Sequence, residues 1–237
     1  MVDLAGAGHR GVMLVTGAGS GDGTTTVLVN VGVVLASATR PVLLIDGNLY
    51  RPRLHTVFGL SNEVGLTSVL ANRASLTEAI QRAPGREGVL VLTSGPVDVD
   101  PAELLSKVDT RNILTAAAIV APVILMDGPP LLSVTGGVIL AGLTSSVIVV
   151  VRAGHTSRTE LASALDLVER TGTPILGVVL NDVAGEQTDE YRTGRARGPD
   201  HGDVAQASQA DLHPPRGRGR RGRGSGETVI GSPVTVP

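Results

Sequence analysis

The chain has 237 residues, of which 42% are hydrophobic, and a formal net charge of -2, which suits one α/β domain with a tail or two small domains. Aromatic residues make up only 1% of it, so stacking surfaces for bases are scarce and we do not expect nucleic acid binding. The absence of cysteine excludes disulfides, thiolate metal sites and a cysteine nucleophile. We see no signal peptide and no bilayer-spanning apolar stretch, and expect a cytoplasmic protein.

Short β-branched runs alternate with helix-like segments up to about residue 181. The pattern predicts strands at residues 12–16, 42–46, 89–93, 123–127, 147–151 and 175–181. Between them it predicts helices at residues 25–38, 76–82, 101–120, 135–141 and 157–171. The strand runs are apolar without alternation, as is typical of strands covered on both faces. We therefore predict an α/β fold, a doubly wound and mostly parallel sheet with flanking helices.

A glycine-rich turn joins the first predicted strand to the first predicted helix. Residues 17–26 read GAGSGDGTTT, the setting of a phosphate-binding loop. Glycine lets the backbone approach a phosphate, and a helix N-terminus attracts anions. One residue departs from the pattern, because Thr24 follows Gly23 where the pattern has lysine. Lys107 is the only lysine in the chain, so no lysine near the loop in sequence can replace it.

Two carboxylates end apolar strands, Asp46 after the second predicted strand and Asp127 after the fourth. The carboxyl ends of parallel strands form the ligand-binding edge of such sheets. An acidic residue at this position holds Mg²⁺ and water in phosphate-loop enzymes. A single aspartate at a strand end is more often a turn residue, but two together with the glycine loop favour a functional site.

The composition changes after Asp182, where apolar periodicity stops. Residues 216–224 read RGRGRRGRG, a low-complexity run. We predict a phosphate-loop domain at residues 1–184 and a disordered Gly/Arg-rich tail at residues 185–237. The arginine run could bind nucleic acid or an anionic membrane surface. We favour a solvated tail, because acidic residues dilute its charge.

Several motifs resemble the bacterial tyrosine autokinases that regulate capsular and extracellular polysaccharide synthesis. Residues 42–55, VLLIDGNLYRPRLH, resemble the family's second nucleotide motif, an apolar run followed by Asp-x-Asp-x-x-Arg-Pro. The other matching stretches are GLTSVL at 65–70, SG at 94–95 followed by PAELL at 101–105, DGPPLLSVT at 127–135 and GVVLN at 177–181. The resemblance covers about residues 12–182 and implies a phosphate-loop NTPase-like domain.

The resemblance implies ATP or ADP and Mg²⁺ as cofactors, and a role for each matching residue. The residues that would line the phosphates are Gly21, Asp22, Gly23, Thr24, Thr25 and Thr26. Asp46 and Asp127 would be the catalytic carboxylates and would hold Mg²⁺ together with Thr25. Asn181 would face the adenine edge; the alternative is that it is a turn residue that ends its strand.

Three residues depart from the family pattern. Thr24 replaces the loop lysine, Asn48 replaces the second aspartate of the Asp-x-Asp pair, and Gly136 replaces an acidic residue after Val-Thr. The loss of one preorganised donor that stabilises developing charge raises the activation free energy by roughly 3–4 kcal/mol and lowers the rate by about 10²–10³. We therefore expect a degenerate, pseudokinase-like nucleotide-binding protein that regulates capsule or exopolysaccharide synthesis or export.

Two alternatives stay open. The chain could be an active ATP-dependent tyrosine autokinase with an atypical phosphate loop and Tyr191 as the acceptor. It could also be a partitioning or division-site type of ATPase, although the Arg51-Pro52 pair and the PAELL stretch speak against that reading.

The resemblance also implies a membrane-embedded polysaccharide co-polymerase or activator as partner, and hence a place at the inner face of the cell membrane. Family members carry a helix before the first strand that helps them to form rings. Here the first predicted strand begins near residue 12, so we expect a monomer or a weak dimer.

Overall fold

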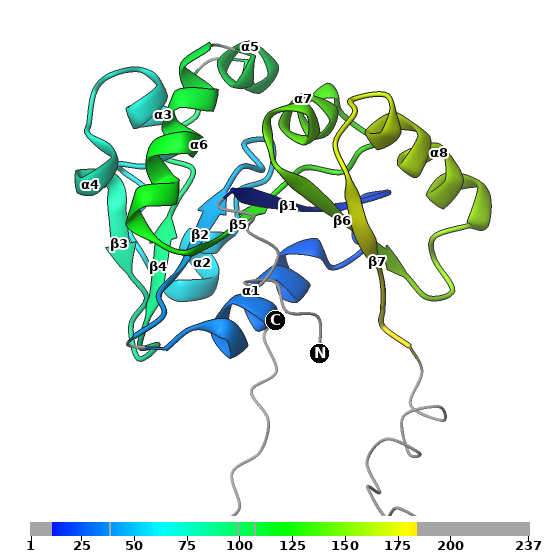
Figure 1. The fold of residues 1–237 in the computed structure, drawn as a ribbon, viewed down its shortest axis with the longest axis horizontal. Coiled ribbons are helices and arrows are strands. Elements are labelled where there is room, and N and C mark those ends of the chain that lie inside the picture. The colour runs from blue at the N-terminus through cyan, green and yellow to red at the C-terminus, as the bar shows by residue number, and fades with distance from the viewer. Residues whose placement is uncertain (1–10, 38, 99, 107, 184–237) are drawn as a thin grey trace, which may run out of the picture. The chain divides into compact units, whose positions relative to one another are not determined.

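In the computed structural model of the chain, residues 11–37, 39–98, 100–106 and 108–183 are described. The predicted tail, with Tyr191 and the arginine run, lies outside these residues, as does Lys107. The described residues form a seven-stranded sheet in the order β3-β4-β2-β5-β1-β6-β7, with helices on both faces (Figure 1). Only β3 runs antiparallel to its neighbour within that part of the chain. The predicted doubly wound α/β fold is confirmed.

Strands lie at all six predicted positions, and β3 is an additional strand. The strands are β1 (Val12–Gly17), β2 (Val42–Asp46), β3 (Ile80–Arg82), β4 (Val89–Leu92), β5 (Val123–Asp127), β6 (Ser146–Arg152) and β7 (Ile175–Asn181). The helices are α1 (Thr24–Leu35), α2 (Leu54–Phe58), α3 (Leu66–Leu70), α4 (Leu76–Ala79), α5 (Pro101–Leu105), α6 (Val108–Val120), α7 (Thr135–Leu143) and α8 (Arg158–Glu169).

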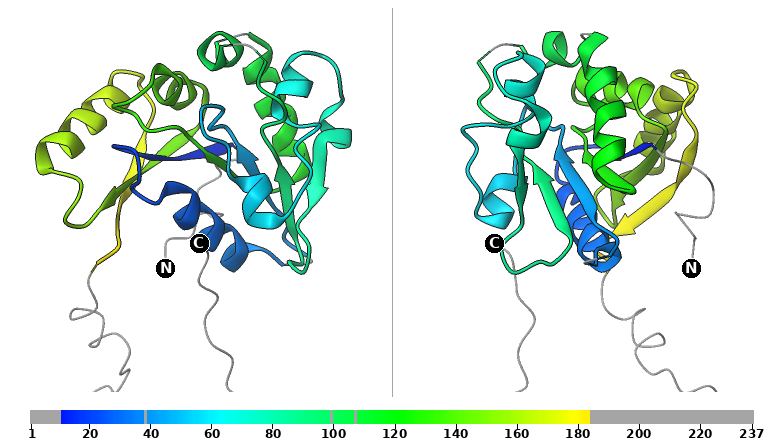
Figure 2. Two further views of the ribbon diagram at one scale, coloured as in Figure 1. Left: turned by 180° about the vertical axis from the view of Figure 1, so that it is seen from behind. Right: turned by 60° about the vertical axis from the view of Figure 1, so that its left-hand side comes forward.

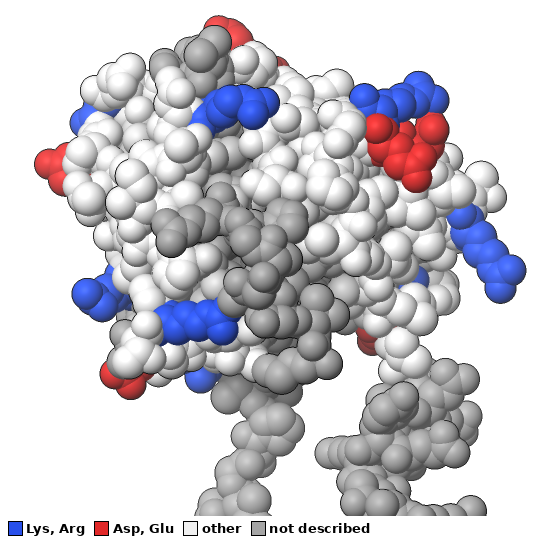
Figure 3. All heavy atoms as spheres, in the orientation of Figure 1, with Lys and Arg blue, Asp and Glu red and all other residues white. Residues whose placement is uncertain are grey.

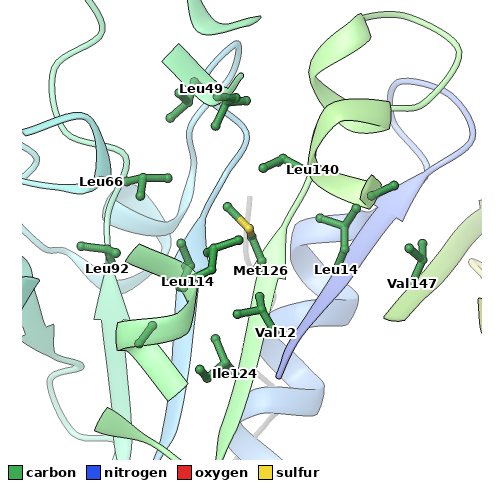
Figure 4. Close-up of a cluster of buried hydrophobic side chains, with 14 of the residues drawn as sticks. Val12, Leu14, Leu49, Leu66, Leu92, Leu114, Ile124, Met126, Leu140 and Val147 are labelled. Atoms are coloured by element: carbon green, nitrogen blue, oxygen red, sulfur yellow. The ribbon is translucent and has the colours of Figure 1, made fainter. Parts of the chain in front are cut away.

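An apolar layer lies on each face of the sheet. On one face α1 and α2 bury Leu28 and Leu54 against the sheet, and this face is opposite the one that carries α7 and α8 (Figure 2). On the other face Leu14, Met126 and Leu140 lie at the centre of a larger cluster (Figure 4). Every residue of β2 and β5 is buried, which explains why these strands are apolar without alternation.

The prediction of one helix at residues 76–82 was wrong in its second half. Ser75 caps the N-terminus of α4: its Oγ accepts a hydrogen bond from Glu78 N, and Glu78 Oε2 accepts one from Ser75 N. At Ile80 the backbone becomes extended, and residues 80–82 pair with β4. The unsatisfied edge of β4 thus outweighs the helical preference of these three residues.

Other predicted boundaries were also wrong. The helix predicted at 25–38 ends at Leu35, after which Ser37 and Arg40 exchange backbone hydrogen bonds in a tight turn. The helix predicted at 101–120 is two helices, since α5 ends at Leu105 and Ser106 Oγ donates to Glu103 O. The short helices α2 and α3 were not predicted.

The outer surface gives two further observations. No described helix combines the length and the apolar character needed to cross a membrane. On the face shown in Figure 3, charged side chains stand singly or in small groups, with wide uncharged areas between them. That face therefore offers no concentrated basic patch among the described residues.

Candidate active site

The loop after β1 turns sharply to begin α1. Gly21 and Gly23 have φ angles of 88° and 86°, a region that favours glycine. Gly23 is the N-cap of α1 and no side chain caps that helix end, which leaves the N–H groups of the first turn for an anion. A Cβ on Gly17 would lie 2.9 Å from Thr24 Oγ1, so the Thr24 hydroxyl lies against the base of the loop.

Asp22 holds the loop in place through hydrogen bonds. This side chain is buried; its Oδ2 accepts a hydrogen bond from Gly19 N at 2.7 Å and its Oδ1 accepts one from Thr156 Oγ1 at 2.7 Å. Asn181 Nδ2 donates to the carbonyl oxygen of Asp22 at 3.0 Å. The loop is thereby joined to the β6–α8 connection and to the end of β7. Both carboxylate oxygens of Asp22 are engaged within the protein.

Asp46 and Asp127 lie side by side at the carboxyl ends of β2 and β5, where they are partners in the strand register. Both are buried. Asp46 Oδ2 accepts hydrogen bonds from Arg53 N and Leu54 N, each at 2.9 Å, and Asp127 Oδ2 accepts one from Thr25 Oγ1 at 2.6 Å. The Oδ1 atoms of both aspartates are buried and have no hydrogen-bond partner within the described part of the chain.

Burial raises the pKa of both carboxyl groups. The pKa of Asp46 rises to about 6, although the N–H groups of Leu54 and Arg53 oppose the shift. The pKa of Asp127 rises to about 8 through burial and, second, through the charge of Asp46; the Thr25 hydroxyl and the charge of Arg53 lower it. Two neighbouring carboxylates in a buried site destabilise each other when both are ionised.

These residues fit a Mg²⁺ ion. Two buried carboxylate oxygens without partners and a nearby hydroxyl are the hard oxygen ligands that Mg²⁺ prefers. The described residues contain no group of three or more His, Cys, Asp or Glu side chains around one position. A bound Mg²⁺ would therefore keep waters or phosphate oxygens in its remaining positions, as this ion usually does.

The structure gives each departure from the family pattern a local setting. Asn48 Oδ1 accepts a hydrogen bond from Arg51 N at 3.2 Å, so it stabilises the turn after β2. At Gly136 an added Cβ would lie 2.8 Å from Tyr50 Cε2, so the ring of Tyr50 occupies the room that a larger residue would need. The backbone N–H of Arg53 donates to Asp46 Oδ2 at 2.9 Å, and the charge of Arg53 lowers the pKa of Asp127.

The residues predicted from the sequence meet at one edge of the sheet. The phosphate loop, the carboxylate pair and Asn181 all lie where β1, β2, β5 and β7 end. Within this group Thr25 contacts Asp127, and Asn181 contacts Asp22. The structure adds Thr156, which reasoning from the sequence missed. No motif marks this residue, because its contact with Asp22 spans 134 positions in the chain.

No model of a known protein family matches the chain. Individual proteins do match. The chain is 35% identical over 179 residues to the tyrosine-protein kinase YwqD of Bacillus subtilis, and the aligned residues make up 76% of this chain and 75% of that protein. It is 31% identical over 183 residues to the tyrosine-protein kinase Etk of Escherichia coli, of which it spans only 25%.

Two solved structures are also similar to the chain. The kinase domain of Escherichia coli Etk matches 81% of this chain and 72% of that domain, with a TM-score of 0.71 and 29% identity. The septum site-determining protein MinD of Pyrococcus horikoshii, solved with Mg-ADP, matches 78% of this chain and 71% of that protein, with a TM-score of 0.61 and 26% identity.

Proposed function

The chain belongs to the bacterial tyrosine-protein kinases, and we propose that it is a degenerate member that binds nucleotide weakly or not at all. In this proposal it regulates the synthesis or export of a capsular or extracellular polysaccharide. The observation that carries the proposal is the phosphate loop itself, which has Thr24 in place of lysine and the buried carboxylate of Asp22 within it.

The electrostatics of the loop disfavour a polyphosphate. The backbone still provides glycine turns and an uncapped helix N-terminus, which attract anions. Without the lysine, however, the loop itself offers no compact positive charge to the phosphates, and the carboxylate of Asp22 lies within it, with Oδ2 2.7 Å from Gly19 N. Weak binding follows because like charges in a poorly solvated site repel each other strongly.

The metal side of the site is retained. Thr25, Asp46 and Asp127 would hold Mg²⁺, which would supply neutralisation of phosphate charge when bound. Asp46 is held by two backbone N–H groups at the start of α2, so its free oxygen keeps one orientation. In an active enzyme Asp46 would position the attacking hydroxyl group or a water molecule held by Mg²⁺.

One observation favours an active autokinase as the second candidate. Arg53 adjoins the carboxylate pair, since its backbone N–H donates to Asp46 Oδ2 at 2.9 Å and its charge lowers the pKa of Asp127. Its guanidinium group could therefore take over part of the role of the lysine. Tyr191, the proposed acceptor, lies outside the described residues. Under either candidate we propose a membrane-embedded co-polymerase or activator as the partner and a place at the inner face of the membrane.

Calorimetric titration with ATP and Mg²⁺ tests the proposal. Wild type should bind weakly or not at all, and the double variant Thr24→Lys/Asn48→Asp should bind at least about tenfold more tightly, because it regains a charge-assisted contact to phosphate. Adding Asp46→Asn to the double variant is the control and should reduce binding again.

A phosphotyrosine assay separates the two candidates. Wild-type autophosphorylation that depends on Asp46 and is lost in Arg53→Ala would refute the degenerate reading and establish the active autokinase. If the double variant fails to bind ATP, the loop backbone is unsuited to phosphate, and the domain is a scaffold without a nucleotide site.

A further inference from the structure

The seven-stranded sheet ends at β7 with an apolar open edge. No described strand pairs with the outer side of β7, which lies at one end of the sheet (Figures 1 and 2). Three alternate residues of β7 are exposed and apolar, Leu176 at 48%, Val178 at 43% and Leu180 at 58%. Leu176 lies where the register with β6 shifts by one residue. Edge strands of this kind are templates for pairing with another strand.

The sequence of β7 carries none of the usual protection of an edge strand. Residues 175–180 read ILGVVL, without a charge or a proline, whereas proteins that keep edges free place lysine, proline or inward charges there. The strand register puts Val178 beside Val149 and Leu180 beside Val151. Val149 and Val151 belong to the buried cluster under α7 and α8, so the apolar row extends this core layer to the edge.

Gly177 gives an independent indication. Its φ is not in the left-handed region, and a Cβ added there would meet nothing within 4 Å. The subunit's own fold therefore has no need of glycine at this position. Glycine inside a strand weakens the strand and often marks the close approach of another backbone.

We propose that β7 pairs with β7 of a second copy of this chain, antiparallel, about a two-fold axis through Val178. The stretch LGVVL at 176–180 reads nearly the same in both directions around this residue. Leu176 would then face Leu180 of the second copy, Val178 would face itself, and Gly177 would lie opposite Val179. Such direct cross-strand pairs are the units that stabilise a sheet, and self-complementarity is what a two-fold interface requires.

The position of α8 is compatible with this pairing. This helix packs on both β6 and β7. A two-fold axis perpendicular to the joined sheet places both α8 helices on the same face. They would be two strand spacings apart, about 10 Å, which is close to the usual distance between packed helices. The paired helices would cover the row of Leu176, Val178 and Leu180 that each subunit leaves exposed.

Sedimentation of the full-length protein over a concentration series tests the proposal. Wild type should show a monomer–dimer equilibrium. Val178→Arg should weaken association at least about 100-fold, because two like charges meet at the axis and such juxtaposition is strongly unfavourable. Val178→Glu should do the same. Val34→Arg is the matched control: Val34 on α1 is 83% exposed, and this change should leave dimerisation unaltered.

Mixing the two charge variants shows whether each has lost only self-association or has failed to fold. Val178→Arg and Val178→Glu should be monomeric alone and form a heterodimer when combined, since opposite charges then face each other. A wild type that stays monomeric, a dimer that survives Val178→Arg, or variants that fail to combine would each overturn the proposal. If the wild type is a monomer and its β7 amides are protected from hydrogen exchange, the proposal is wrong and another segment of the same chain pairs with β7.

Discussion

At the scale of single residues, the carboxylate pair combines two costs that a metal ion would remove. Asp46 and Asp127 are both buried, each has one oxygen with no hydrogen-bond partner among the described residues, and the charge of Asp46 disfavours ionisation of Asp127. A divalent cation between them would satisfy both oxygens and compensate both charges. In its absence the pair favours protonation, and this makes the stability of the metal-free protein depend on pH.

The first prediction concerns this pH dependence. The folded-state pKa values of Asp46 and Asp127, about 6 and about 8, exceed those of the unfolded chain, so the folded state binds more protons between pH 4 and 8. The free energy of unfolding without Mg²⁺ should therefore fall as pH rises through this range, by at least about 1.4 kcal/mol, the equivalent of one unit of pKa shift.

Urea unfolding at pH 5 and pH 8 measures the effect. Asp127→Asn should flatten the dependence, because its side chain cannot ionise. Glu87→Gln, at an exposed position, should keep the wild-type slope. An Asp127→Asn protein as sensitive to pH as the wild type would show that Asp127 is already ionised in the folded state.

The second prediction separates backbone strain from side-chain overlap in the phosphate loop. Gly21→Ala should destabilise the protein by roughly 1–2 kcal/mol through its positive φ alone, since nothing lies within 4 Å of an added Cβ. Gly23→Ala should cost more, because its Cβ would also overlap with Asn181 Nδ2. Adding Asn181→Ala should recover stability in Gly23→Ala and not in Gly21→Ala, as thermal unfolding would reveal.

At the scale of elements, the loop is held by parts of the chain that lie far from it in sequence. Thr156, in the connection between β6 and α8, donates to Asp22 Oδ1 and accepts from Arg152 N. Asn181 at the end of β7 adds a second contact to the loop. The shape of the phosphate loop therefore depends on β6, α8 and β7 as well as on its own glycines.

The third prediction tests the hydrogen bond between Thr156 and Asp22. Thr156→Val should destabilise the protein by roughly 1–3 kcal/mol, because it leaves a buried carboxylate oxygen of Asp22 without its donor. Thr156→Ser should retain most of the stability. Thr159→Val, at an exposed position in α8, is the control for the loss of a threonine hydroxyl. Equal stability of Thr156→Val and Thr159→Val in urea unfolding would mean that this hydrogen bond contributes nothing.

At the scale of the whole molecule, the carboxyl edge of the sheet and its β7 edge carry different kinds of residue. Its carboxyl edge carries the loop and the carboxylates, whereas its β7 edge presents uncharged apolar residues. Parallel pairing alone produces the first arrangement, since it brings the carboxyl ends of neighbouring strands together.

The fourth prediction concerns the segment outside the described residues. The composition of residues 185–237 predicts a disordered tail, so limited trypsin digestion should remove it beyond about residue 185 and leave a folded core. Mass spectrometry identifies the products. Protection of residues 216–223 in the free protein would contradict the prediction.

The sequence by itself determined the six parallel strands, the phosphate loop and the places of Asp46 and Asp127. It could do so because apolar runs without alternation indicate strands that are buried on both faces, and because a parallel sheet brings the strand ends to one edge. Three residues of β3 and the short helices α2 and α3 carry too little periodicity to be recognised. Only the tertiary structure decided that Asp22 and Thr156 bond and that Tyr50 lies over Gly136. It also decided that both carboxylates are buried and that no described strand pairs with the outer side of β7. These features depend on which distant segments become neighbours, which a local pattern of residues does not encode.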